Sequence, residues 1–310
     1  MVVATRNRAA RLQGLLDSLA RQTLDPERFE VIVVDDGSTD ETRDVLARAA
    51  RHEVLRVRAA KGPGGGPARA RNLGWRDARA PLVAFTDDDC EATPEWLESA
   101  LAAAAERPGA IVQGPTTPIP AELERTGPFT RTRDIPDPNP SYQTCNIVYP
   151  REVLERLDGF DERLPEALGE DTDLGWRARE NGVDLHWSEA TRVHHAVDDL
   201  GPAGFLRSAL IGADAVAVFK RHPGLRAELR WGVVRTPGSV SLGLALAGIA
   251  VARRAPALGA LLALPYARHL ARTCAGQRAP LLLAPYYAVR DLLLAFTSLR
   301  GSLRHRTLVL

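Results

Sequence analysis

Cysteine is scarce in this sequence, and its placement excludes two common stabilising devices. Cys90, Cys145 and Cys274 are odd in number, far apart and in no C-x-x-C spacing, so neither a disulfide framework nor a zinc site is indicated. Lysine is scarcer still, because Lys61 and Lys220 are the lysines among 40 basic residues. The first residues, MVVATRNR, lack the apolar stretch of about 7–15 residues that a signal peptide needs, so we expect the N-terminal part to be cytoplasmic.

Charge divides the chain into two parts of opposite sign. Residues 201–310 contain 15 basic and three acidic residues, whereas residues 1–200 contain 25 basic and 36 acidic residues. Their net charges are therefore +12 and −11 within a total of +1. We predict a first domain over 1–200 and a helical region over 201–310, each facing a different partner.

Residues 1–200 alternate between strand and helix patterns. Short apolar runs without polar interruption are typical of strands buried on both faces of a parallel sheet. The alternation with helices predicts an α/β fold with an open, mostly parallel sheet flanked by helices. The predicted strands are 2–4, 31–34, 54–57 and 82–85.

Several signals predict where helices begin and end. Leucines at positions 12, 15, 16 and 19 have the i, i+3, i+4, i+7 spacing of a helix face. Ser38-x-x-Glu41 has the form of a capping box, which predicts a helix through about Ala50. Thr93 followed by Pro94 predicts the start of another helix, as N-cap and first residue.

Carboxylates follow two of the predicted strands directly. Asp35 and Asp36 end the strand 31–34, and Asp87–Asp89 follow the strand 82–85. Because ligands of such sheets bind beyond the carboxyl ends of the strands, we expect these carboxylates to share one crevice. Adjacent carboxylates are costly to desolvate without a cation, and Mg²⁺ or Mn²⁺ usually takes one or two of them plus phosphate oxygens. The pattern favours a metal that holds a diphosphate; for either cluster the alternative is a solvated turn.

The glycine-rich stretch KGPGGGPARARNLG is not a dinucleotide-binding motif. It lacks the third glycine of a dinucleotide-binding motif and follows the third predicted strand instead of the first. No P-loop is found elsewhere in the sequence. Taken alone, the stretch is more typical of a flexible loop.

Six stretches, taken together and in this order, resemble the family 2 glycosyltransferases with the GT-A fold. The resemblance covers roughly residues 1–200 and implies an inverting transfer from a nucleotide-diphosphate-sugar to an acceptor hydroxyl, assisted by Mg²⁺ or Mn²⁺. The QxxRW element of processive members is missing, which implies transfer of a single sugar. The stretches are VVATRNRAARLQGLLDSLARQT, VIVVDDGSTDET, GPARARNLG, FTDDDCEATPEWL, CNIVYPREVLERLDGFDERL and GEDTDLGWRARENG.

The resemblance implies roles on the donor side. Asp89, the last residue of the DxD element, would ligate the metal. His195 would supply an imidazole ligand, with His194 as the alternative because the two are adjacent; a structural histidine is the other interpretation. The residues implied to bind the nucleotide-sugar are Thr5, Arg6, Asp36, Arg71, Asp87 and Asp88.

The acceptor side follows from the same resemblance. Asp171 of the ED motif would be the base that deprotonates the acceptor, and Glu170 would orient it or bind acceptor hydroxyls. Alternatively, both carboxylates only favour the N-terminus of a helix. We assign the proline-rich segment 114–140 to the acceptor side and place Asn146 near the sugar, while Trp176 is either a stacking platform or a core residue.

The basic tail contains long runs without charge. Residues 236–252 form a run of 17, at the lower limit for a bilayer span, and residues 255–267 form a shorter one. Arginines at the ends of the runs are typical of helices on an anionic membrane surface, which predicts association with the cytoplasmic face of the membrane. A helical tail packed on the first domain, or forming a dimer, is the alternative. The absence of an aromatic–basic pattern argues against nucleic acid.

Two other functions compete with glycosyl transfer. A nucleotidyltransferase acting on a sugar phosphate also uses metal-binding carboxylates, but it normally has a basic glycine-rich loop near the first strand, and residues 5–13 contain no glycine. A non-catalytic, membrane-bound nucleotide-sugar-binding protein would keep the site without turnover. Release of nucleoside diphosphate, of pyrophosphate or of neither separates the three.

Overall fold

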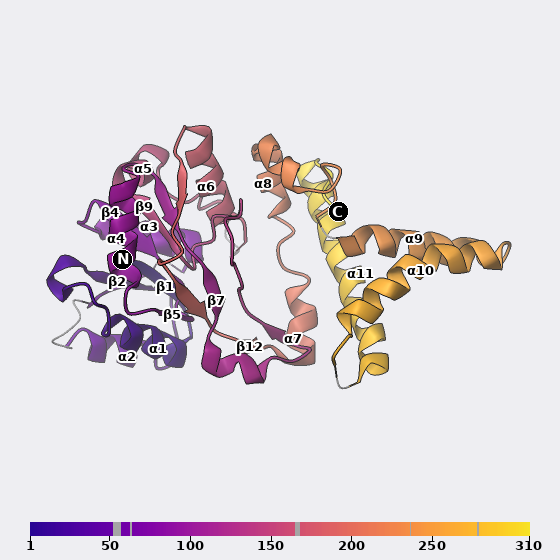
Figure 1. Ribbon diagram of the computed structural model, residues 1–310, viewed down its shortest axis with the longest axis horizontal. Coiled ribbons are helices and arrows are strands. Elements are labelled where there is room, and N and C mark those ends of the chain that lie inside the picture. The colour runs from indigo at the N-terminus through magenta and orange to yellow at the C-terminus, as the bar shows by residue number, and fades with distance from the viewer. Residues whose placement is uncertain (52–56, 63, 165–167, 236, 278) are drawn as a thin grey trace. The chain divides into compact units, whose positions relative to one another are not determined.

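The computed structural model describes residues 1–310 except 52–56, 63, 165–167, 236 and 278. The chain divides into two compact units (Figure 1). The first consists of Met1–Arg125 and Arg131–Asp198, and the second of Thr126–Thr130 and Asp199–Leu310.

A seven-stranded mixed sheet is the centre of the first unit. Its strand order is β10-β6-β9-β4-β1-β2-β3, and β9 is the strand that runs antiparallel to both of its neighbours. The remaining pairs are parallel. The strands are β1 Val2–Thr5, β2 Val31–Asp35, β3 Val57–Lys61, β4 Leu82–Phe85, β6 Ile111–Gln113, β9 Ile147–Pro150 and β10 Leu185–Trp187.

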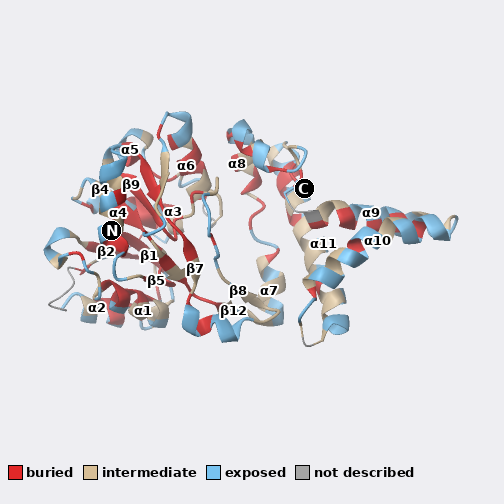
Figure 2. Ribbon diagram, in the orientation of Figure 1, coloured by how far each residue is buried: buried red, intermediate tan, exposed pale blue. Residues whose placement is uncertain are grey.

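Helices cover this sheet and complete its core (Figure 2). The predicted leucine face of α1 is buried, as expected for a helix whose apolar residues recur every three to four positions. The fully buried side chains of β2 confirm the predicted strand that is apolar on both faces. The helices are α1 Ala9–Leu19, α2 Thr42–Ala49, α3 Pro67–Asp77, α4 Trp96–Glu106, α5 Arg151–Leu157 and α6 Glu170–Glu180, with short 3₁₀ turns at Pro26–Arg28 and Pro120–Arg125.

A smaller sheet extends the acidic segment that follows β4. β11 (Val193–His195) pairs antiparallel with β5 (Cys90–Ala92) and parallel with β7 (Thr116–Pro118). The short strands β8 (Thr130–Arg131) and β12 (Asp198–Asp199) form a separate two-stranded sheet. Because β5 begins directly after Asp89, this sheet fixes the direction in which that aspartate faces.

Two local predictions need correction, and a third lies mostly outside the described residues. The capping box is not formed: Asp40 Oδ1 accepts the N–H and hydroxyl of Thr42, while Ser38 Oγ accepts the N–H of Asn7. Helix α4 begins at Trp96 and not at Pro94. Most of the predicted strand 54–57 lies outside the described residues, and β3 begins at its last residue, Val57.

The second unit is helical, as the sequence predicts. Its elements are α7 Gly201–Ser208, α8 Val216–Arg221, a 3₁₀ turn at Pro223–Glu228, α9 Pro237–Val251, α10 Pro256–Thr273 and α11 Pro280–His305. Aromatic rings pack together around α7 and α11, with Phe129 lying 4.9 Å from Tyr286 and 6.3 Å from Phe205 between ring centroids. Among the described residues, no helix combines the length and the apolar character needed to cross a bilayer.

Candidate active site

The three aspartates after β4 face different partners. Asp88 and Asp89 are buried, while Asp87 is partly exposed. Thr5 at the end of β1 donates its hydroxyl to Asp88 Oδ2 over 2.7 Å. Burial, followed by the charge of Asp89, raises the pKa of Asp88 to about 7 although Arg8 and the Thr5 hydroxyl oppose the shift. Thr5 thus orients one of the carboxylates that the sequence placed beside the nucleotide.

Arg8 is the counter-ion of this cluster, a role that was not predicted from the sequence. Its Nη1 lies 2.6 Å from Asp89 Oδ2 and 3.4 Å from Asp198 Oδ2, and its Nε lies 3.9 Å from Asp88 Oδ1. Burial disfavours the charged guanidinium, but the charges of Asp89 and Asp88 outweigh it and raise the pKa of Arg8. Arg11, one helical turn later, binds Asp198 at 3.2 Å. No motif or spacing in the sequence connects these two arginines with the aspartates.

His195 Nε2 and Asp89 Oδ1 face each other. His195 Nδ1 donates to the carbonyl of Ala196 over 2.9 Å, which turns Nε2 toward the acidic cluster. That Nε2 lies 3.4 Å from Asp89 Oδ1, a buried oxygen to which no described residue makes a hydrogen bond. An imidazole nitrogen and a carboxylate oxygen at this separation can ligate the same cation. Asp89, Cys90 and His195 offer ligand atoms within 4.8 Å of one another, but burial raises the pKa of the Cys90 thiol, which disfavours the thiolate as a ligand.

The strand register decides between the two histidines. His195 pairs with Cys90 across β5 and is buried beside Asp89. His194 faces the opposite side, where its Nδ1 lies 2.9 Å from the hydroxyl of Thr117. His195 is therefore the imidazole that the acidic cluster meets.

Arg71 joins the acidic cluster to the start of α6. Its Nη2 lies 2.8 Å from Asp87 Oδ1 and its Nη1 lies 2.8 Å from Glu170 Oε1, and the side chain is 8% exposed. Burial opposes ionisation, yet the charges of Asp87, Glu170 and Asp171 raise the pKa of Arg71. Two segments about 80 residues apart in the chain are thus held to one guanidinium.

The two carboxylates of α6 differ in their surroundings. Glu170 is buried, and its Oε2 has no hydrogen-bond partner among the residues that the structure describes; burial and then the charge of Asp171 raise its pKa to about 7. Asp171 is partly exposed and accepts the N–H of Thr172 at 2.7 Å. Burial raises the pKa of Asp171, while this hydrogen bond and Arg71 oppose the shift. A carboxyl group with a raised pKa is suited to accept a proton near neutral pH.

Asp36 organises the glycine-rich loop. Its Oδ1 accepts the N–H groups of Gly64 and Gly65, and its Oδ2 accepts that of Gly66. A Cβ atom on Gly62 would lie 2.7 Å from Asp36 Oδ1, so the loop and the carboxylate fit closely. Asp36 lies at the same sheet edge as the aspartate cluster, because its N–H donates to the carbonyl of Thr5. The resemblance implies that Asp36 binds the nucleotide-sugar, and in the structure its carboxylate holds the glycine-rich loop. Arg6 is exposed in the turn after β1.

Asn146, which the sequence analysis placed near the sugar, lies in the core. Its Nδ2 donates to the carbonyls of Pro115 (3.1 Å) and Thr191 (2.7 Å), and its Oδ1 accepts the indole N–H of Trp96 at 2.9 Å. The residue is 1% exposed. Its amide therefore joins three segments in the core, with both N–H groups and the oxygen engaged in hydrogen bonds.

The C-terminal end of the proline-rich segment, with the residue that follows it, lies against α6. Thr172 Oγ1 donates to the carbonyl of Ser141, and the Trp176 indole N–H donates to that of Pro140, both over 2.9 Å. A Cβ atom on Gly175 would lie 2.0 Å from Tyr142 Cγ. Trp176 is buried, which supports the core interpretation over a stacking platform.

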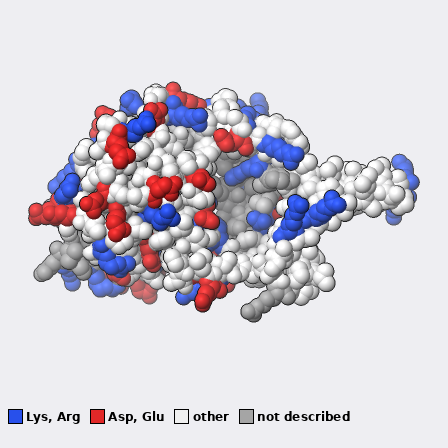
Figure 3. Space-filling model, viewed as in Figure 1, with Lys and Arg blue, Asp and Glu red and all other residues white. Residues whose placement is uncertain are grey.

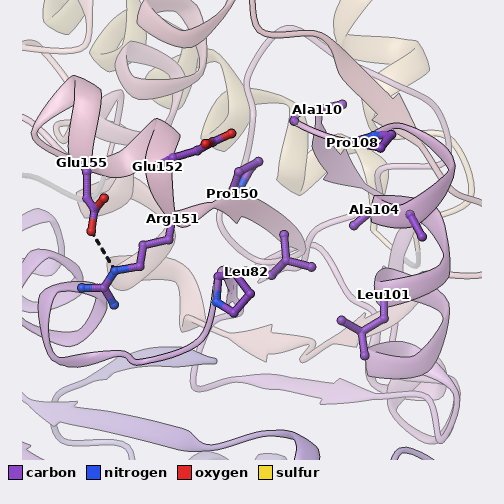
Figure 4. Close-up of a pocket in the computed structure, with 12 residues that line it drawn as sticks. Leu82, Leu101, Ala104, Pro108, Ala110, Pro150, Arg151, Glu152 and Glu155 are labelled. Atoms are coloured by element: carbon purple, nitrogen blue, oxygen red, sulfur yellow. Dashed lines mark hydrogen bonds and ion pairs between the residues drawn. The ribbon is translucent and has the colours of Figure 1, made fainter.

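A pocket of about 640 Å³ lies elsewhere in the first unit (Figure 4). Leu82, which begins β4, and Pro150, which ends the antiparallel strand β9, line it together with α4 and α5 residues. Its position at the amino end of β4 is opposite to the aspartates that follow the carboxyl end. Since ligands of such sheets bind at carboxyl ends, the pocket is separate from the acidic site.

Comparison with solved structures defines the class of fold. A mannosyltransferase from Pyrobaculum calidifontis, solved in complex with GDP-Man and Mn²⁺, matches with a TM-score of 0.60 at 19% identity, over 98% of this chain and 86% of that chain. Staphylococcus aureus TarS, residues 1–349 with UDP-GlcNAc, matches with a TM-score of 0.55 at 19% identity, over 99% and 91% of the two chains. The fold is GT-A, followed by a helical region.

The chain belongs to glycosyl transferase family 2. Residues 1–158 match the family model described as "Glycosyl transferase family 2". A validoxylamine A glucosyltransferase of Streptomyces hygroscopicus subsp. limoneus is 32% identical over 267 residues, which cover 75% of this chain and 58% of the relative. A pre-mycofactocin glycosyltransferase of Mycobacterium tuberculosis is 31% identical over 243 residues, covering 74% and 49%. The chain thus spans about half of the length of these relatives.

Proposed function

We propose that the protein transfers a single sugar from a nucleotide-diphosphate-sugar to an acceptor hydroxyl, with inversion at the anomeric carbon and with Mg²⁺ or Mn²⁺. One observation carries the proposal: Arg71 holds Asp87 of the aspartate cluster and Glu170, the neighbour of Asp171, at 2.8 Å each. The two ion pairs support a donor site and a base at the same end of the sheet. The similarity to glucosyl- and mannosyltransferases supports the reaction class.

On the donor side, Asp89 and His195 would hold the metal ion. The ion would supply positive charge to the departing diphosphate. Thr5 holds Asp88 in place through its hydroxyl, and Arg8 adds a second positive charge at the same carboxylates. The metal-bound mannosyltransferase of similar fold supports the choice of cofactor.

On the acceptor side, Asp171 is the proposed base. The acceptor oxygen forms a bond to the anomeric carbon, the bond from that carbon to the diphosphate breaks, and Asp171 takes the acceptor proton. A single displacement of this kind inverts the anomeric centre. Arg71 pairs with Glu170, the neighbour of the proposed base. Of these two carboxylates, Asp171 is the one that is partly exposed to solvent. We also propose that the acceptor is lipid-linked or lies near a membrane, because residues 201–310 are basic and apolar.

The test is product release from a panel of nucleotide-sugars with Mn²⁺. Sugar-dependent release of nucleoside diphosphate is expected, while pyrophosphate release would indicate a nucleotidyltransferase and binding without turnover a scaffold. Asp171→Asn should lower turnover at least about 100-fold, the usual contribution of a general base, while nucleotide binding persists. Asp158→Asn, at an exposed position, is the matched control and should keep normal turnover. Normal turnover in Asp171→Asn would refute the assignment of the base.

A further inference from the structure

Helices α9 and α10 form a closely packed antiparallel hairpin within the second unit (Figure 1). They cross at two glycines: a Cβ on Gly248 would lie 2.7 Å from the carbonyl oxygen of Gly259, and a Cβ on Gly259 would lie 2.9 Å from that of Gly248. Small residues at the crossing let the two backbones approach directly. The larger apolar side chains of both helices are thereby left to face outward, which is a packing mode common among helices in lipid.

The outward faces of this hairpin are apolar. Helix α9 carries no charged residue, and its own leucine, isoleucine, valine and alanine side chains are distributed over all of its sides. Ile249 is 71% exposed and Leu261 is 65% exposed. A helix that is apolar all round is normally buried in a protein core or in lipid. The exposed large apolar residues of the hairpin are Leu244, Leu246, Ile249, Leu258, Leu261 and Leu264.

The charges of the hairpin all have one sign. Residues 237–273 contain Arg253, Arg254, Arg268 and Arg272 and no aspartate or glutamate. Arg253 and Arg254 are exposed in the turn between the helices, and Figure 3 shows basic side chains at this free end and along the hairpin. A second copy of the chain seated on the hairpin would bring these like charges together. An anionic surface supplies the opposite charge.

We propose that the α9–α10 hairpin binds an anionic lipid surface and lies in the plane of the headgroups. Its apolar sides would enter the boundary with the acyl chains, and its arginines would pair with lipid phosphates. Insertion by the turn is disfavoured because it would place Arg253 and Arg254 in the hydrocarbon. The length agrees, since 15 residues of α9 extend about 22 Å, less than the roughly 30 Å hydrocarbon core. The inference rests on the proposed membrane-proximal acceptor but does not depend on turnover.

The experiment is flotation of the full chain with vesicles of phosphatidylcholine alone or with added phosphatidylglycerol. Binding is expected only with phosphatidylglycerol and should weaken as salt is raised, because salt screens exposed charges. The Arg253→Gln/Arg254→Gln double variant should bind about 30-fold more weakly, because each basic residue near such a surface contributes about one factor of five. Ile249→Gln and Leu261→Gln should each lower binding about tenfold or more, through lost burial of one apolar side chain.

Matched variants separate this binding from other causes. Leu123→Gln changes an equally apolar, 52% exposed residue of the first unit and should leave vesicle binding unchanged. Asp171→Asn should also bind normally, so a failed transfer reaction leaves this test intact. Circular dichroism and thermal unfolding check that the hairpin variants are folded. Equal binding to both vesicle types, or no binding to either, would overturn the proposal. So would a concentration-dependent dimer that the Ile249→Gln change abolishes while vesicle binding is unaffected.

Discussion

Replacing Arg71, whose guanidinium pairs with both Asp87 and Glu170, should destabilise the protein strongly. Arg71→Gln deletes two ion pairs of 2.8 Å, to Asp87 and to Glu170, whose side chain is 3% exposed. Breaking a buried pair from one side leaves an uncompensated charge and costs about 3–5 kcal/mol. Glu170 Oε2 already lacks a hydrogen-bond partner within the described part of the chain, so none of the described groups compensates for the loss. We expect the free energy of unfolding to fall by about that amount above neutral pH.

The loss should depend on pH in a definite direction. The pKa of Glu170 is raised to about 7, by burial and then by the charge of Asp171, and removing Arg71 raises it further. A carboxyl group whose pKa is higher in the folded than in the unfolded protein favours folding below its unfolded value, and this contribution is lost as the pH rises through the folded value. The difference between variant and parent should therefore be larger at about pH 8 than at about pH 5.

Urea unfolding at both pH values measures this difference. Arg76→Gln on the same helix is the matched control: its pair with Asp158 is exposed, so its loss should cost at most about 1 kcal/mol at either pH. An Arg71→Gln protein that unfolds no more easily than Arg76→Gln, or whose loss is equal at both pH values, would refute the reasoning.

Three further changes test other parts of the site. Arg8→Gln should tighten Mn²⁺ binding about tenfold, measured by titration of free Mn²⁺ by electron paramagnetic resonance, because losing a charged hydrogen bond to Asp89 worth about 1.5 kcal/mol removes a competing cation; unchanged affinity would contradict this. Asn146→Ala should lower the free energy of unfolding by about 2–4 kcal/mol in urea, since two buried carbonyls lose their donor; a loss below that of an exposed substitution would argue against a structural role. Gly175→Ala should lower the melting temperature by overpacking against Tyr142, at a cost of about 1–3 kcal/mol, and a normal melting temperature would show that the ring moves aside.

The sequence predicted the elements whose signal is local. The strand 82–85 was predicted with the bounds it has in the structure, because an apolar run between polar turns is enough to define it. The antiparallel direction of β9 was not predicted, because strand direction depends on partners far away in the chain. The capping box failed for a similar reason: Asp40 takes the N–H of Thr42 and also that of Ala9, a contact between segments 31 residues apart.

The sequence predicted the types of residue in the site but not the contacts that each of them makes. Aspartates after a buried strand indicate a cation, and the structure supplies one in Arg8, whose guanidinium no spacing rule connects to Asp89. Asn146 shows the opposite failure. An asparagine next to a predicted site suggests ligand contact, but hydrogen bonds to Pro115 and Thr191 occupy it, and only the folded chain brings those carbonyls within reach.

The alternation of side chains along β11 restricts insertions and deletions in related sequences. Its alignment with β5 and β7 determines which of two identical neighbours, His194 or His195, turns toward Asp89. Displacing the strand by one position would exchange the two imidazoles while leaving the composition unchanged. We therefore expect related chains to vary freely in residue type near this strand while rarely gaining or losing a single position there. An insertion or deletion of one residue in β11 would turn the other histidine toward Asp89, whereas one of two residues would keep the same face.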